Sequence, residues 1–220
     1  MATQNSINKK SESLTLDPGA SGDSFVQFDI NGTSEFRIGV DDTASDAFKI
    51  SQGSALGTND VLVATAAGEI TQPLQPAFLA VLASTISNVT GDGTLYTIVW
   101  DTEVFDQNSD FDGTSTFTAP VTGRYEISMA VTVGDLGAAH TDGYSLIYTS
   151  NRSYLPHQAN YAAYRDSSNI VSLSFSILCD MDAADTANIE ILISNGTKIV
   201  DIVSNGATDP YNWFSAVLVS

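Results

Sequence analysis

The chain has 220 residues, of which 43% are apolar and 15% are charged, so a sizeable core is available and wholesale disorder is not expected. Acidic residues outnumber basic residues by 26 to 8, which gives a net charge of -18. This balance argues against nucleic-acid binding through a general basic surface, and anionic membranes would repel the chain.

The N-terminal residues 1–13 are polar and contain the adjacent pair Lys9 and Lys10. They fit either a flexible arm or a peptide that becomes ordered when it docks onto a larger assembly. No apolar signal segment opens the chain, and no run reaches transmembrane length. We therefore expect synthesis in a cytoplasm and no membrane insertion.

Residues 14–70 consist of short extended runs separated by turn residues, among them Asn31-Gly32, a strong hairpin signal. About 57 residues of such short strands would expose too much apolar surface as the private core of one chain. The segment is therefore predicted to fold only with copies of itself. Residues 71–76, TQPLQP, contain two prolines and are typical of a short stiff linker, which predicts a domain boundary at this point.

Residues 77–220 form the larger module. Between 124 and 133 apolar and polar residues alternate, the pattern of a half-buried antiparallel strand. The segments 77–82 and 213–219 are apolar on both faces, so each needs a packing partner on both sides. Eight strand candidates with turns between them predict a jelly roll or sandwich: 77–82, 95–105, 115–119, 124–133, 143–150, 170–180, 187–195 and 213–220.

The aromatic and glycine pattern of the larger module is similar to that of a known family of trimeric heads. The pattern is Phe105-x5-Phe111-x5-Phe117-x5-Gly123-x-Tyr125. It resembles the jelly-roll heads of complement first-component globular domains and tumour necrosis factor, in the versions found on bacteriophage fibres. The resemblance implies a homotrimer in which the sheet holding both ends of the head lies against the threefold axis. The interface residues implied are Phe78, Leu79, Val81, Tyr211, Trp213, Phe214, Ala216 and Leu218.

The first module also resembles a known kind of structure. Its pieces GDSFVQFDI, FRIGVDD, SDAFKIS and LGTND are similar, in this order, to shaft modules of phage fibres, in which three chains wrap into a narrow β-prism. The full expectation is an all-β chain: an attachment arm (1–13), a short trimeric β-prism-like shaft (14–70), a linker (71–76) and a jelly-roll β-sandwich head (77–220).

No catalytic grouping is found in the sequence, so we expect a protein that is not an enzyme. His140 and His157 lack a zinc-binding spacing, and no nucleophile elbow or phosphate-binding loop occurs. Cys179, the single cysteine, excludes an intrachain disulfide and is interpreted as a buried, inert thiol.

One acidic loop could hold a structural calcium ion, and the sequence indicates no other cofactor. Asp106, Asn108, Asp110 and Asp112 precede Gly113 in the pattern D-x-N-x-D-x-D-G and offer hard oxygen ligands. The alternative is that these side chains make the turn through their own hydrogen bonds. The loop lacks the later glutamate of an EF-hand.

The best candidate for ligand binding is an aromatic loop at 154–166. Aromatic faces suit sugar rings, and the polar side chains suit their hydroxyl groups. The alternative is that these tyrosines pack between subunits. The candidate residues are Tyr154, His157, Gln158, Asn160, Tyr161, Tyr164 and Arg165.

These observations predict a virion protein made in the cytoplasm of a host bacterium. The chain would be a homotrimeric phage fibre or decoration protein, fixed to other virion proteins by its N-terminal arm, with a head that binds host-surface glycans or other receptors. The alternative is a purely structural capsid or tail protein whose head clamps the trimer and binds nothing.

Overall fold

The computed structural model describes residues 15–19 and 21–220. The chain divides into two compact units, Met1–Leu74 and Gln75–Ser220. The predicted attachment arm lies outside the described residues. Among the described residues, strands make up the regular structure of both units apart from two very short helices, which confirms the all-β class. Neither of the helices that the structure describes is long and apolar enough to cross a membrane.

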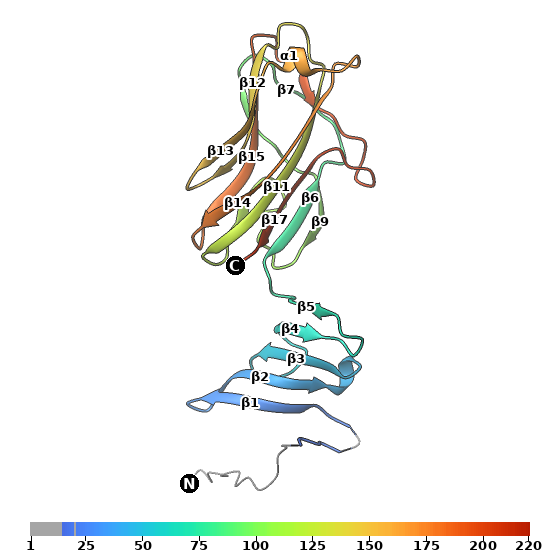
Figure 1. Ribbon diagram of the computed structural model, residues 1–220, viewed down its shortest axis with the longest axis vertical. Coiled ribbons are helices and arrows are strands. Elements are labelled where there is room, and N and C mark those ends of the chain that lie inside the picture. Colours follow the sequence, from blue (N-terminus) through green and yellow to red (C-terminus); the bar gives the residue numbers. More distant parts are fainter. Residues whose placement is uncertain (1–14, 20) are drawn as a thin grey trace. The chain divides into compact units, whose positions relative to one another are not determined.

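The N-terminal unit is a single antiparallel sheet. Its elements are β1 (Ser24–Ile30), β2 (Thr33–Asp41), the short 3-10 helix η1 (Asp42–Ala44), β3 (Ala47–Gln52), β4 (Asp60–Ala64) and β5 (Ile70–Thr71). Each strand pairs with the next along the chain (Figure 1). Asn31 and Gly32 form the first turn with φ angles of 53° and 80°, which suit these two residue types. The intertwining of three such chains stays a prediction.

One face of this sheet is apolar and stays open within the unit. The register places Phe28 opposite Phe36 and Val40 opposite Phe48, so apolar side chains of neighbouring strands form a continuous surface. Phe28 is 55% exposed. This open apolar face consists of Val26, Phe28, Phe36, Ile38, Val40, Phe48, Ile50, Leu62, Ala64 and Ile70. Contiguous apolar surface of this kind marks a site of association.

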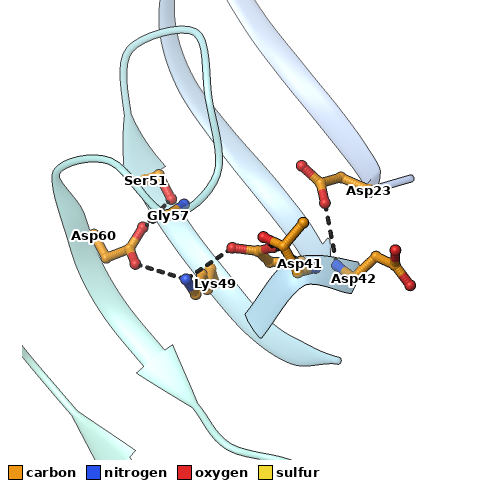
Figure 2. Close-up of polar contacts among 8 residues, drawn as sticks. Asp23, Asp41, Asp42, Lys49, Ser51, Gly57 and Asp60 are labelled. Atoms are coloured by element: carbon orange, nitrogen blue, oxygen red, sulfur yellow. Dashed lines mark hydrogen bonds and ion pairs between the residues drawn. The ribbon is translucent and has the colours of Figure 1, made fainter. Parts of the chain in front are cut away.

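The opposite face carries polar groups that are covered within the unit. Lys49 is 7% exposed, and its Nζ lies 2.9 Å from Oδ2 of Asp41 and 3.0 Å from Oδ2 of Asp60 (Figure 2). The hydrogen bond with Asp41 is the main cause that raises the pKa of Lys49, and the same bond lowers the pKa of Asp41. A network of two carboxylates and one ammonium group therefore occupies the covered side of the sheet.

Gly57 allows the loop between β3 and β4 to approach this network. Its N–H donates to Oδ1 of Asp60 at 3.0 Å, and its φ of 82° is one that side chains rarely adopt. A Cβ at this position would lie 2.9 Å from Oδ2 of Asp41. A larger residue would therefore strain the loop and push it away from the ion pairs.

The C-terminal unit, called the head below, is a jelly-roll β-sandwich of two antiparallel sheets (Figure 1). Its elements are β6 (Ala77–Val81), β7 (Ile86–Thr90), β8 (Leu95–Thr97), β9 (Thr102–Asp106), β10 (Phe117–Thr118), β11 (Gly123–Gly134), β12 (Asp142–Thr149), β13 (Ser153–Gln158), α1 (Tyr161–Tyr164), β14 (Val171–Met181), β15 (Thr186–Ser194), β16 (Val200–Ile202) and β17 (Trp213–Leu218). One sheet has the order β10-β15-β12-β13, with β8 paired to β15. The other has the order β7-β16-β11-β17-β6-β9, with β14 paired to β11. Between β9 and β16 the chain repeatedly changes sheet, as in a jelly roll.

The alternation in β11 directs one row of its side chains into the sandwich, as predicted. The buried row, at most 1% exposed, consists of Tyr125, Ile127, Met129, Val131 and Val133. The facing sheet contributes Ile147, Ile189, Ile191 and Ile193, which are fully buried. Each such side chain contributes about 1.5–3 kcal/mol to stability through burial. Cys179 is buried, as expected.

An aromatic cluster explains most of the Phe and Tyr pattern. Phe78 stacks on Phe111 and Phe117, with ring centroids 4.8 and 5.2 Å apart. The Tyr125 hydroxyl donates to the carbonyl of Val121 at 2.8 Å and so fixes the turn before β11. Phe105, the first residue of the pattern, is different because it is 47% exposed.

The prediction of one strand over 95–105 is wrong. The chain leaves β8 in one sheet and enters β9 in the other, crossing the core with Ile98 and Trp100 buried. The Asp101 carboxylate accepts hydrogen bonds from the backbone N–H groups of Ala83 and Ser84, which holds the crossing. Continuous apolar composition fits a crossing through a core as well as it fits a strand.

Candidate functional site

A hollow of about 570 Å³ opens at one side of the head, between edge strand β13 of one sheet and edge strand β14 of the other. It is lined by the end of β13 and the start of β14, with Tyr161 and Tyr164 of α1 between them. The size is that of a small-molecule site. Both edges belong to the same chain, so no second subunit is needed to form the hollow.

Two side-chain contacts connect the two sheet edges beside the hollow. The guanidinium of Arg152 lies 2.7 Å from the carboxylate of Asp180. Farther along, the ring of His157 meets the ring of Phe175 edge to face, with centroids 6.3 Å apart. The hollow lies beside this contact, and its lining on β13 begins at Pro156.

Tyr161 lines the hollow and carries a buried hydroxyl group. Its side chain is 1% exposed, and its hydroxyl makes no hydrogen bond of normal geometry with any described residue. Burial raises the pKa of Tyr161, while nearby Ser145 opposes the rise to a smaller extent. The hydroxyl therefore stays protonated and can donate a hydrogen bond.

The other polar groups that line the hollow are either uncharged or negatively charged. Burial lowers the pKa of His157, whose Nδ1 lies 3.3 Å from Oγ of Ser145, so the imidazole is uncharged at neutral pH. Asp166 contributes a carboxylate, and its Oδ1 accepts from the N–H groups of Ser168 and Ile170 at 2.8 and 2.9 Å. No lysine or arginine that the structure describes lines the hollow.

The structure brings together four of the seven predicted ligand-binding residues at this hollow: His157, Gln158, Tyr161 and Tyr164. The other three do not line it. The Asn160 side chain accepts from Ala163 N at 3.1 Å and caps α1, while Tyr154 lies farther along β13 beside Cys179. Nη1 of Arg165 is buried with no hydrogen-bond partner among the described residues.

Sequence reasoning missed half of the wall. The interpretation of 154–166 as a loop is wrong, because the segment contains all of β13 except its first residue and the whole of α1. Pro156, Ala159, Asp166 and residues 170–173 complete the lining. The wall at 170–173 was not predicted, since nothing in the sequence indicates that β13 and β14 lie at neighbouring sheet edges. Asp166 carried the one available signal, a charged residue beside tyrosines.

Two carboxylates of the acidic loop before β10, those of Asp106 and Asp112, build turns, whereas Oδ2 of Asp110 is buried without a hydrogen-bond partner among the described residues. Asp106 accepts from the N–H groups of Asp110 and Phe111, at 3.1 and 2.9 Å. Oδ1 of Asp112 accepts from three successive N–H groups, those of Thr114, Ser115 and Thr116, at 2.8 to 3.0 Å. No group of three or more acidic, histidine or cysteine side chains arranged for a metal ion exists in the part of the chain that the structure describes. Calcium binding by Asp106, Asn108, Asp110 and Asp112 stays a prediction.

The predicted interface residues lie on both faces of the sheet that holds β6 and β17. Phe78, Phe214 and Ala216 are at most 2% exposed and belong to the core of their own sandwich. Val81 is also buried, and Leu218 packs against the core. On the outer face lies a patch, called the outer patch below, that the sequence did not fully indicate: Leu79, Phe105, Tyr211, Trp213 and Val217.

Comparison with known proteins gives matches in solved structures alone. No protein-family model and no curated protein match the chain. The globular domain of zebrafish complement 1qA protein is similar over 66% of this chain and 98% of its own, with 15% identity and a TM-score of 0.47. Murine APRIL at pH 8.5 is similar over 66% of this chain and 99% of its own, with 11% identity and a TM-score of 0.44. The description of the head as a jelly roll rests on its own strands and their register.

Proposed function

We propose that the chain is a homotrimeric structural protein of a bacteriophage virion, a short fibre or a decoration protein, whose head binds a host-surface glycan or another receptor. The observation that carries the proposal is the open apolar face of the N-terminal unit. The phage setting comes from the resemblance of the segments GDSFVQFDI, FRIGVDD, SDAFKIS and LGTND to fibre shaft modules.

The open apolar face supports self-association because the other side of the sheet is already covered. Lys49, Asp41 and Asp60 occupy that covered side, so the sheet has no second apolar surface on which to fold. Ten side chains of the open face would gain about 1–2 kcal/mol each from burial by neighbouring copies. Other copies of the same chain are the partner for this face, because they are present whenever the protein is made.

The outer patch supports the same assembly from the head. Leu79 lies opposite Phe105 on the neighbouring strand, and Trp213 lies beside a hollow of about 390 Å³. Val217 is 39% exposed on the same outer face. Aromatic and aliphatic side chains of this kind form the buried centres of subunit interfaces.

The hollow between β13 and β14 supports the recognition part of the proposal. Three weak sites on one rigid trimer, repeated over a virion, hold a cell surface by avidity although each site alone binds weakly. The alternative function is a purely structural trimer clamp or decoration protein without a ligand. The open apolar face and the outer patch support this structural function equally well, because assembly of the trimer requires no receptor.

Sedimentation of the full chain at micromolar concentration tests the assembly. We expect a species of three times the 23.2 kDa chain mass. A stable, well-folded monomer would overturn the proposal. A trimer that neither adsorbs to host cells nor competes with virions for them would leave the purely structural function in its place.

A further inference from the structure

The hollow between β13 and β14 has a composition that selects among ligands by charge. We propose that it takes the ring of an uncharged saccharide and discriminates against acidic saccharides. The inference rests on the proposed function, since it names the chemistry of the ligand that the head would bind.

The two tyrosines give the hollow an inner and an outer aromatic surface. Tyr161 is 1% exposed and forms part of the inner wall, whereas Tyr164 is 73% exposed and stands at the outer end. An exposed phenol ring offers a flat apolar face on which the C–H face of a sugar ring can stack. Ile170, Val171 and Leu173 add apolar lining to the same hollow.

The unpaired hydroxyl of Tyr161 favours a polar ligand. It is a buried donor without a partner in the described part of the chain, and such a group costs stability until it is paired. A ligand hydroxyl in the hollow would accept this hydrogen bond. Gln158 and Ser172 line the same space and can both donate and accept, which matches the double role of sugar hydroxyl groups.

The charges of the hollow set its selectivity. Asp166 brings a carboxylate, and the neutral His157 brings no compensating positive charge. No described lysine or arginine lines the site, and the whole chain carries a net charge of -18. A saccharide carboxylate bound in the hollow would meet like charge, and none of the lining residues offers it a counter-ion. A cationic ligand is less suited, because one oxygen of Asp166 is already held by two backbone N–H groups.

The test compares matched sugars on the full-length assembled protein. The probes are the methyl glycosides of glucose, galactose and mannose and the same glycosides oxidised to the carboxylate at C6. Ligand-observed NMR titration measures both sets under identical salt. We expect at least one neutral glycoside to bind saturably. The affinity of its acidic counterpart should be lower by about fivefold or by a larger factor.

Three substitutions separate the parts of the inference. Tyr164→Ala should weaken the neutral glycoside about tenfold through the lost stacking surface, while Tyr148→Ala, at a 41% exposed tyrosine outside the hollow, should have no effect. Tyr161→Phe should weaken binding without lowering the melting temperature, because it removes an unpaired hydroxyl. Asp166→Asn should reduce the difference in affinity between neutral and acidic glycosides. The amide oxygen can still accept the hydrogen bonds from the backbone N–H groups of Ser168 and Ile170.

The outcomes distinguish this inference from the proposed function. Equal or tighter binding of the acidic glycosides, or an unchanged ratio in Asp166→Asn, would overturn the selectivity. If no glycoside binds to an intact trimer, the saccharide inference fails and the trimeric assembly stands. If Tyr164→Ala dissociates the trimer, the hollow is a subunit contact and the inference also fails.

Discussion

The head and the N-terminal unit place their apolar side chains in opposite ways. In the head, apolar rows of two sheets face each other, so Ile127 of β11 and Ile189 of β15 are both fully buried. In the N-terminal unit the single sheet buries Lys49 and leaves Phe28 half exposed. A two-layer unit can satisfy its core alone, whereas a single-layer unit has only one covered face and must find its second layer elsewhere.

The comparison indicates where the stability of each unit comes from. The free energy of unfolding of the head comes mainly from its own sandwich, and only the smaller contribution of the outer patch should depend on protein concentration. The free energy of unfolding of the N-terminal unit should rise with concentration, because its open face is buried only by association.

The largest effect is expected from a charge on the open apolar face. Phe28→Asp should raise the concentration needed for assembly by about a hundredfold or more, because a buried, unpaired carboxylate costs several kcal/mol. Sedimentation across a dilution series measures this, and circular dichroism should show that the head stays folded. Thr58→Asp, in an exposed loop of the same unit, is the control. If Phe28→Asp stays trimeric, the N-terminal unit does not depend on association through its open apolar face, and the proposed difference from the head is wrong.

Removal of the buried cation comes next. Lys49→Met would leave the carboxylates of Asp41 and Asp60 without their partner, and we expect a loss of about 3 kcal/mol in the N-terminal unit. The matched control is Arg152→Met in the head, whose ion pair with Asp180 is exposed and should contribute nothing measurable. Chemical denaturation measures both variants. Equal effects would show that the covered face does not depend on its ion pairs.

A smaller effect is expected at the acidic turn of the head. Asp112→Ala should cost about 1 kcal/mol, since three backbone N–H groups lose their acceptor. Asp112→Asn should cost less, because an amide oxygen can still accept. Melting temperatures measured with calcium and with a chelator decide between a turn and a metal site. A large loss in Asp112→Asn that appears only with calcium would favour the metal.

The smallest effect is expected from pH and should be confined to the N-terminal unit. The hydrogen bond from Lys49 lowers the pKa of Asp41, so the folded state binds this proton less readily than the unfolded state. The stabilisation is complete above the ordinary pKa of 3.8 and is lost as the pH falls through the lowered value. Unfolding measured at pH 5 and pH 3 should show this loss, and Asp41→Asn should show less of it. An equal loss in both proteins would assign the acid sensitivity to other carboxylates.

Sequence patterns correctly predicted the elements that depend on only a few neighbouring residues. The alternation of Tyr125 to Val133 predicted β11 and its buried row, and Asn31-Gly32 predicted the first hairpin, because side-chain period and φ preference act within a few residues. The strand β13 was missed, since Pro156 and the polar residues beside it hide a strand at a sheet edge.

Long-range placement limited the prediction of the sites. His157 and Tyr161 were identified by residue type, but the opposite wall at 170–173 depends on which strands end at the edges of the two sheets. The same limit applies to the outer patch. Phe78 and Val217 both lie on strands that are apolar on two faces, and register alone decides that Phe78 points into the core and Val217 outward.

The position of β6 has a mechanical consequence. This strand is the first of the head, and it is hydrogen-bonded to β17 on one side and to β9 on the other. A pulling force that enters the head at Ala77 while the far end is tethered runs along the strand axis and loads both ladders in shear. The hydrogen bonds of both ladders must then break together and not one by one, so the head resists unfolding by a force that pulls on its first strand.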